Sequence, residues 1–275
     1  MIRALGAGGA VRCIAVDATE VARHTAEVHG LGPSAAWLAA EALVANLLLS
    51  GHIKGEEQIS LQLRTAEPEV HYYGQVTSDG VCRARLAPAD SLINAPISGL
   101  LVAVKSIVRK ELYRGAVAVE NESLEAALSR YMASSAQIPA FLRLGASVDA
   151  DGLVRFAGGL IVERLAEEPG MPWLDDEAFE QQFATVAERA LETLVEDLMS
   201  GSLLGEPTQT IWQKPLVWQC RCTIERTEAA LSAFGRAALV DMADEDGEAR
   251  IECDFCGQVR TITGERLREI AKLLG

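Results

Sequence analysis

The sequence predicts an α+β protein in which a mixed N-terminal α/β domain with a mainly antiparallel sheet is followed by a helical linker and a small C-terminal domain. Three observations lead to this prediction. Strand-like and helix-like patterns alternate over about the first 160 residues, an acidic stretch of helical periodicity follows, and four of the six cysteines lie near the C-terminus. We place the three parts at residues 1–165, 166–211 and 212–275.

Several segments of the N-terminal domain are expected to be strands, because apolar and β-branched side chains alternate or run together in them. These segments are residues 11–16, 59–64, 70–76, 81–86, 101–107, 116–119, 141–148 and 153–162. Ile59, Leu61 and Leu63 should share one buried face, since successive strand residues point to opposite sides. The sequence has no GxGxxG turn, no P-loop and no regular βαβ rhythm, which argues against a doubly wound nucleotide-binding fold.

An alanine-rich helix is expected to begin at Pro33 and to end near Gly51. It is the most apolar helical run of the chain, yet it is short for a bilayer and contains Glu41 and Asn46. We therefore expect a buried core helix and no membrane partner. A second helix is expected at residues 122–134.

The middle of the chain is strongly acidic. The formal net charge is −14, and residues 163–197 alone contain 11 acidic and two basic side chains. An amphipathic helix should begin at Asp175 or Asp176 and end at Gly201. Its apolar stripe consists of Phe179, Phe183, Val186, Leu191, Leu194 and Leu198. Because an isolated helix of this length is marginally stable in water, the stripe must pack either permanently on its own domain or conditionally, as a linker that can undock.

The charge and the N-terminus limit the partners and the compartment. Nucleic-acid affinity comes largely from Lys and Arg, so an excess of acidic side chains argues against a nucleic-acid partner. The N-terminus lacks a basic segment followed by an apolar one, so we expect no secretory signal and a cytoplasmic location. In a reducing compartment the cysteines should be thiols or metal ligands.

Four cysteines have the spacing of a metal site. Cys220 and Cys222 form a C-x-C pair, and after 30 intervening residues Cys253 and Cys256 form a C-x-x-C pair that precedes a glycine. Two close pairs can place four thiolates around one tetrahedral Zn²⁺; the alternative is four unrelated buried cysteines. Four protein ligands leave no position for water, so catalysis at this zinc is not expected.

The rest of the C-terminal domain agrees with such a role. Helices are expected at residues 225–234, 236–243 and 265–274. Roughly sixty residues form only a small core, so a bound metal would help this domain to fold. The other two cysteines, Cys13 and Cys82, lie inside expected strands and should be small buried side chains.

The cysteine cluster is either a permanent support or a switch. Thiolates can be oxidised through sulfenic acid to a disulfide, and close spacing provides the second thiol. Loss of zinc would remove on the order of 10 kcal/mol of folding free energy from the small domain. Oxidation could therefore unfold it.

The two cysteine pairs resemble those of the heat-shock protein 33 kDa family, the 33 kDa chaperonins, which are redox-regulated molecular chaperones of the bacterial cytosol. Shorter motifs accompany them in order along the chain. These are HGLGPS at residues 29–34, KGEE at 54–57, YRG at 113–115, Tyr131, QIP at 137–139 and AGGL at 157–160. The resemblance covers essentially the whole chain, and the cysteine arrangement is its most specific part.

This resemblance implies an ATP-independent holdase, not an enzyme, that binds unfolding proteins under oxidative stress. It implies that Cys220, Cys222, Cys253 and Cys256 bind zinc in a reduced, inactive form. Oxidation would pair Cys220 with Cys222 and Cys253 with Cys256, with zinc release, unfolding of the C-terminal domain, loosening of the linker, exposure of apolar surface and dimerisation. We expect the acidic helix to cover an apolar face of the N-terminal domain until the zinc domain unfolds, and its charge to keep the opened protein soluble.

The sequence departs from the family pattern in two places. SAQ at residues 135–137 stands where the family has SEQ, and VRTI at residues 259–262 replaces aromatic residues often found after the second cysteine pair. The second difference bears on the packing and the oxidation threshold of the zinc domain, while all four predicted ligands are retained.

Two other classes of function are considered. A zinc-ribbon adaptor would bind a protein constitutively and would not respond to an oxidant. An enzyme is disfavoured, because the histidines form no recognisable ligand or Ser/Cys/His signature. The histidines are His24, His29, His52 and His71.

Overall fold

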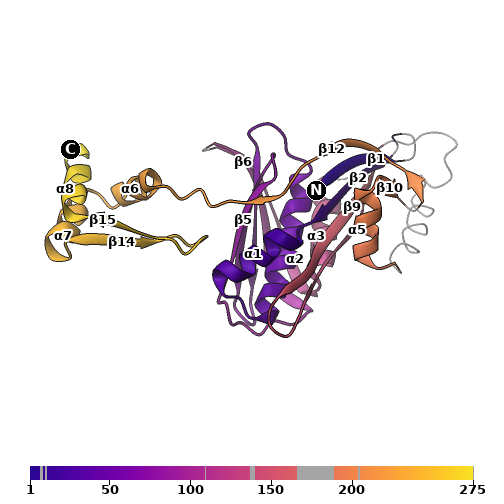
Figure 1. Cartoon of the computed structure of the whole chain (residues 1–275), viewed down its shortest axis with the longest axis horizontal. Helices are drawn as coiled ribbons and strands as arrows, with labels where there is room; N and C mark the ends of the chain where they lie inside the picture. The colour runs from indigo at the N-terminus through magenta and orange to yellow at the C-terminus, as the bar shows by residue number, and fades with distance from the viewer. Residues whose placement is uncertain are drawn as a thin grey trace. The chain divides into compact units, whose positions relative to one another are not determined.

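The computed structural model describes residues 1–6, 9, 11–108, 110–136, 140–165, 189–203 and 205–274, with the backbone alone at residues 135 and 136. The chain divides into two compact units, Met1–Gln219 and Cys220–Gly275. Both contain helices and antiparallel strand pairs (Figure 1). The predicted α+β class with mainly antiparallel sheets is therefore confirmed.

The first unit contains two large sheets. Among the described residues, one sheet has the order β12-β1-β2-β9-β8 and is antiparallel throughout. Its strands are β1 (Ile2–Gly6), β2 (Val11–Asp17), β8 (Ala140–Val148), β9 (Val154–Arg164) and β12 (Gln209–Gln213). We call it the first sheet.

The second sheet has the order β13-β5-β4-β3-β6-β7, and within the described chain only β13 runs parallel to its neighbour. Its strands are β3 (Gln58–Thr65), β4 (His71–Thr77), β5 (Val81–Ala87), β6 (Ile97–Ile107), β7 (Lys110–Glu122) and β13 (Val217–Trp218). Ile59, Leu61 and Leu63 on β3 are all buried, as their alternation predicted.

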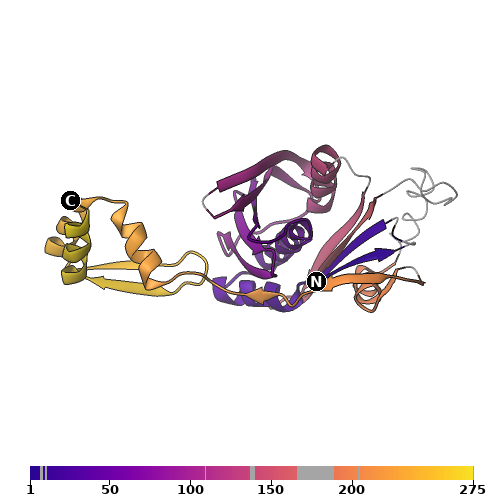
Figure 2. The same cartoon turned by 90° about the horizontal axis from the view of Figure 1, so that it is seen from above.

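A nearly all-apolar helix fills the space between the sheets. Helix α2 (Pro33–Ser50) contacts strands of both sheets and contributes much of the main core (Figure 2). Its length and composition would suffice to cross a membrane, contrary to the sequence expectation, but 78% of its 18 residues are buried inside the unit. The helix is therefore a buried core helix, as the sequence predicted. Helix α1 (Thr19–His29) contacts α2, β5 and β9, and helix α3 (Leu124–Ala136) contacts α2, β7 and β8.

All the strand segments predicted in the N-terminal domain are present, with ends shifted by a few residues. Strands β1, β12 and β13 and helix α1 were not predicted. In the strands, pairing partners far away in the chain decide the structure: Ile2 is paired with Gln213, and Val217 with Val81. Residues 212–219, which we placed with the C-terminal domain, thus belong to the first unit, where 212–213 and 217–218 pair with its strands, and the second compact unit begins at Cys220.

The described part of the acidic linker forms a short helix and two small hairpin strands. These are α5 (Leu191–Met199), β10 (Ser202–Leu203) and β11 (Glu206–Pro207). The predicted helix starts at Asp175 or Asp176, but its residues Phe179, Phe183 and Val186 lie outside the described residues. The end of the predicted linker, from residue 209, forms part of the edge strand β12 of the first sheet.

The second unit is small. It consists of α6 (Ile224–Ser232), α7 (Arg236–Glu245), β14 (Glu248–Glu252), β15 (Val259–Thr263) and α8 (Gly264–Leu273). Thr223 and Thr263 cap α6 and α8 by accepting hydrogen bonds from the backbone N–H groups of Arg226 and Arg266. The buried core is Leu231, Leu239, Ala243, Ile262, Leu267, Ile270 and Ala271. Such a small core leaves the unit dependent on further cross-links.

Candidate metal centre

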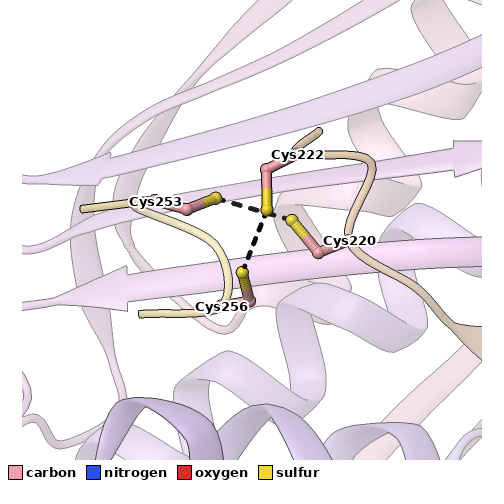
Figure 3. Close-up of side chains that lie close together, drawn as sticks. All are labelled: Cys220, Cys222, Cys253 and Cys256. Carbon is pink, nitrogen blue, oxygen red and sulfur yellow. Dashed lines mark hydrogen bonds between the residues drawn. The ribbon is translucent and has the colours of Figure 1, made fainter. Parts of the chain in front are cut away.

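The four C-terminal cysteines converge on one point. Their sulfur atoms all lie within 4.8 Å of one another, and Figure 3 shows the side chains pointing toward a common centre. Cys220 and Cys222 lie in the segment before α6, and Cys253 and Cys256 lie in the turn between β14 and β15. The second unit thus brings together all four residues that the sequence predicted as ligands.

A tight turn shapes the second cysteine pair. The backbone N–H groups of Cys256 and Gly257 donate to the carbonyl oxygen of Cys253 at 3.2 and 2.8 Å. The N–H of Cys253 donates to the carbonyl oxygen of Gln258 at 3.0 Å. Gly257 has a φ of 65°, which glycine adopts without the steric penalty of a Cβ. The glycine that follows the C-x-x-C pair therefore permits the turn that brings the two sulfurs together.

The distances between the sulfur atoms agree with a tetrahedral metal site. The sulfurs of Cys220 and Cys253 are 3.5 Å apart, and those of Cys222 and Cys256 are 3.4 Å apart. Four sulfurs bound at about 2.3 Å to a central ion would be about 3.8 Å from one another. The cluster could therefore bind one metal ion, and four cysteine ligands in this arrangement fit zinc.

The thiols of the cluster differ in their affinity for protons. Burial raises the pKa of Cys256 to about 12 and also raises the pKa of Cys220. At Cys222 burial acts in the same direction, but hydrogen bonds with Cys256 and Arg260 outweigh it and lower the pKa to about 7. Ionising all four thiols in so small a volume requires a bound cation to offset their mutual repulsion.

The sequence missed two side chains next to the cluster. One Nη atom of Arg260 donates to the carbonyl oxygen of Cys222 at 2.8 Å and to Oε1 of Gln258 at 2.9 Å, and it lies 3.8 Å from the sulfur of Cys222. Oε1 of Gln258 lies 3.8 Å from the same sulfur. The sequence offered one indication that Gln258 and Arg260 lie near the cluster. Both follow closely after the second cysteine pair, where a hairpin turns the chain back toward the cluster.

Cys13 and Cys82 are separate from the cluster. They are 0% and 1% exposed on β2 and β5, and burial raises the pKa of each to about 12. The prediction that they are small buried side chains is confirmed. They belong to different cores: Cys13 lies on the α5 side of the first sheet, and Cys82 lies in the core around α2.

Helix α5 covers one face of the first sheet. Leu194, Val195 and Leu198 are at most 2% exposed, and Leu191 packs at the margin of the same core. A Cβ at Gly145 of β8 would lie 3.3 Å from Leu191, so this glycine leaves room for the helix. The sheet residues beneath are Ile2, Val11, Cys13, Ala15, Leu160 and Val162, which we call the α5-covered face. Figure 1 shows α5 lying along this sheet beside β9.

The histidines do not gather into a site. Each is held by a different neighbour: His24 by Trp218, His29 by the Ala84 carbonyl, His52 by Glu163 and His71 by Glu69. The four histidines thus have four different partners. Glu163 is fully buried; although burial raises its pKa, hydrogen bonds from His52 and Arg12 lower it to about 2.

Comparison with known proteins agrees with the site. A family model described as Hsp33 protein matches residues 1–263, which include all four cysteines. The chain is 25% identical to the 33 kDa chaperonin of Bacillus subtilis (strain 168), over 97% of this chain and 96% of that protein. It is 26% identical to the 33 kDa chaperonin of Desulfotalea psychrophila, over 98% and 96%.

A solved structure has a similar fold. It is the 33 kDa chaperonin (heat shock protein 33 homolog) of Thermotoga maritima, with a TM-score of 0.81 and coverage of 98% of this chain and 97% of that chain. The sequence identity is 22%, so this likeness concerns the fold.

Proposed function

The chain belongs to the Hsp33 family of chaperones, and we propose that it is a redox-regulated, ATP-independent holdase that binds unfolding proteins under oxidative stress. The single observation that carries the proposal is the convergence of Cys220, Cys222, Cys253 and Cys256 in a unit with a very small core. A unit built this way loses its main cross-link when its thiolates are oxidised.

In the reduced, inactive form the four cysteines bind one Zn²⁺. When bound, the ion supplies metal–sulfur bonds that join the segment before α6 to the β14–β15 turn. The seven-residue core of this unit is supplemented by binding free energy on the order of 10 kcal/mol. The second unit is therefore folded in the reduced state and only marginally stable once its metal–sulfur bonds are lost.

Oxidation pairs Cys220 with Cys222 and Cys253 with Cys256. A thiolate attacks peroxide, an S–O bond forms and hydroxide leaves; the neighbouring thiolate then displaces hydroxide from the sulfenic sulfur and an S–S bond forms. Every pair of sulfurs in the cluster lies within 4.8 Å, so both disulfides are within reach after small side-chain movements. Sulfurs consumed in disulfides are no longer thiolate ligands, and the second unit unfolds.

The α5-covered face becomes the client-binding surface. The chain runs from α5 through β12 and β13 directly into Cys220, so once residues 220–275 unfold this segment is held only by its own contacts with the first unit. Helix α5 has a short apolar stripe and carries Glu192, Glu196 and Asp197, so little besides its packing holds it in place. Its release exposes apolar side chains that bind unfolded segments of client proteins.

The partners follow from this surface. Exposed apolar surface binds partly folded clients, and two activated copies can cover part of it by forming a homodimer. The acidic linker keeps the opened protein soluble. We assign the protein no nucleic-acid partner, no membrane partner and no enzymatic activity. We assign it a cytoplasmic location.

Two native cysteines provide a direct test. The full zinc-loaded chain is treated with peroxide at mild heat, then alkylated, and labelling of Cys13 and Cys82 is followed by peptide mass spectrometry. Cys13 lies beneath α5 and Cys82 lies beneath α2, so release of α5 should accelerate the labelling of Cys13 at least about 10-fold and leave Cys82 protected. Suppression of aggregation of a model client is measured on the same samples.

Each outcome separates the possibilities. Equal acceleration at both cysteines would mean that the whole first unit opens, and no acceleration would mean that α5 stays docked; either result would refute the assigned surface. Client binding of equal strength before and after oxidation would instead identify a constitutive adaptor.

A further inference from the structure

We propose that Arg260 is a positioning residue of the cysteine cluster. Arg260 holds the Cys222 thiolate in place and thereby raises the oxidant concentration needed for zinc release. This inference rests on the proposed zinc site and concerns the chain's own residues around it. Arg260 lies in the stretch where the sequence departs from the family pattern, and nothing in that pattern assigns it a role.

The side chain of Arg260 is fixed by several contacts. It projects from β15, where Arg260 is paired with Ile251 of β14. One Nη atom donates to the Cys222 carbonyl oxygen at 2.8 Å and to Gln258 Oε1 at 2.9 Å, and approaches the Cys222 sulfur to 3.8 Å. A guanidinium held at both the backbone and the sulfur of one ligand limits the positions that this ligand can adopt.

One atom of this half-buried guanidinium lies out of contact with water, which favours a nearby negative charge. Its Nε atom is buried and has no hydrogen-bond partner within the described part of the chain. Burying part of a cation is costly unless an anion compensates for the lost hydration. The Cys222 carbonyl and the Gln258 amide are neutral, and the nearby Glu225 carboxylate is fully exposed. The thiolate cluster is the anion in contact with Arg260, so both groups gain from the contact.

Arg260 contacts one of the four cysteines more closely than the others. Among the described contacts of Arg260, those with the cluster go to Cys222. A Zn²⁺ bound by four thiolates carries two net negative charges, which a neighbouring cation partly offsets. A hydrogen bond to a ligating sulfur draws electron density from it and orients it, as outer contacts of metal ligands commonly do.

This contact acts on the first step of oxidation. In that step a sulfur lone pair attacks one oxygen of hydrogen peroxide, the O–O bond breaks, and hydroxide leaves with the electron pair of that bond. The sulfur becomes a sulfenic acid; a second thiolate then attacks it, a disulfide forms and a second hydroxide leaves. Lower electron density on the Cys222 sulfur slows the attack on peroxide, so Arg260 makes the cluster less sensitive to oxidant.

The test compares variants of the full, zinc-loaded chain. Zinc release is followed with a chromogenic chelator over a series of peroxide concentrations, and the oxidised cysteines are mapped by mass spectrometry. Arg260→Gln removes the charge and should release zinc about 10-fold faster at a given peroxide concentration, with earlier oxidation of Cys222. Arg260→Lys keeps the charge but not the planar guanidinium, and its rate should fall between those of the parent protein and of Arg260→Gln.

A matched control separates this effect from a general change in charge or stability. Arg250 is exposed on β14 of the same hairpin, and Arg250→Gln should release zinc at the parental rate. The inference is overturned if Arg260→Gln releases zinc at the parental rate, if Arg250→Gln accelerates release equally, or if Arg260→Lys is as fast as Arg260→Gln. If the parent chain binds no zinc, the proposed function fails as well, which is a distinct result.

Discussion

The sulfur atoms of Cys222 and Cys256 lie 3.4 Å apart, although 34 positions separate the two residues in the chain. This contact closes the second unit, because it joins the segment that enters α6 to the turn that leads into β15. If the segment before α6 or the turn before β15 unfolds, two of the four sulfurs leave the cluster. The two cysteines that remain are either neutral thiols or thiolates that repel one another. The stability of the unit and its affinity for metal are therefore coupled.

Replacement of one of the four cysteines should weaken both zinc binding and the folding of the second unit. In Cys220→Ser the hydroxyl is a poor zinc ligand, so we expect a loss of zinc affinity larger than the about 10–100-fold typical of changes around a metal ligand. Residues 220–275 should be loosened even under reducing conditions. Zinc content and thermal unfolding measure both effects. Arg221→Gln, between the two ligands of the pair, is the control, and a Cys220→Ser protein with parental zinc content and Tm would contradict the assignment.

Removal of the metal should act on the second unit first. With a chelator and a reductant present, amide hydrogen exchange should rise across residues 220–275, because the core of the unit is too small to replace the lost binding free energy. Strands β3 and β4 should keep their protection, since they belong to the main core. Uniform protection with and without chelator would show that the unit folds without metal.

Helix α5 should respond to oxidant. Residues 191–199 should exchange at least about 10-fold faster after peroxide treatment, because the helix is short and is held by its apolar stripe. Helix α2, buried between the sheets, is the internal reference. Unchanged protection of α5 in a protein that binds clients would place the client surface elsewhere.

Weakening the contact of α5 with the sheet should mimic oxidation. Leu198 is fully buried, and Leu198→Ala should reduce the stability of docking by about 2–4 kcal/mol. This loss should release α5 and allow client binding in the reduced, zinc-loaded protein. Thr193→Ala, at an exposed position of the same helix, is the control. A Leu198→Ala protein that is inactive until oxidised would contradict the proposed autoinhibition.

The buried Glu163 should make the first unit sensitive to acid. Its carboxylate accepts a hydrogen bond from His52 at 2.7 Å and pairs with Arg12, and its pKa is lowered from 4.5 to about 2. A lowered pKa means that the stabilising contribution is present above about pH 4.5 and is lost as the pH falls toward 2.

The variant Glu163→Gln removes one partner of a buried charge network. It should destabilise the first unit by about 3 kcal/mol at neutral pH and flatten the loss of stability between pH 4.5 and 2. Denaturant unfolding at several pH values measures this. Equal acid sensitivity of parent and variant would refute the role of Glu163.

Local patterns in the sequence were sufficient for much of the fold. Alternation at Ile59, Leu61 and Leu63 identified a strand, and the alanine-rich run from Pro33 identified the core helix. Such periodicity reflects which face of an element meets the core, and neighbouring residues encode it. The spacing of Cys220, Cys222, Cys253 and Cys256 likewise predicted a cluster, because metal sites require short intervals within each pair.

The tertiary structure decided the features that depend on distant partners. Strand β1 is a strand because it is paired with β2 and β12, and β12 lies more than 200 positions away in the chain. The contacts of Arg260 with Cys222, and of α5 with the first sheet, likewise join residues with no common local pattern. By itself the sequence predicted the longer strands and helices of the core and the four cysteines that cluster, since both arise from short-range spacing. Only the folded chain decided what covers the apolar sheet and which cation lies beside the Cys222 sulfur, because these depend on packing between distant segments.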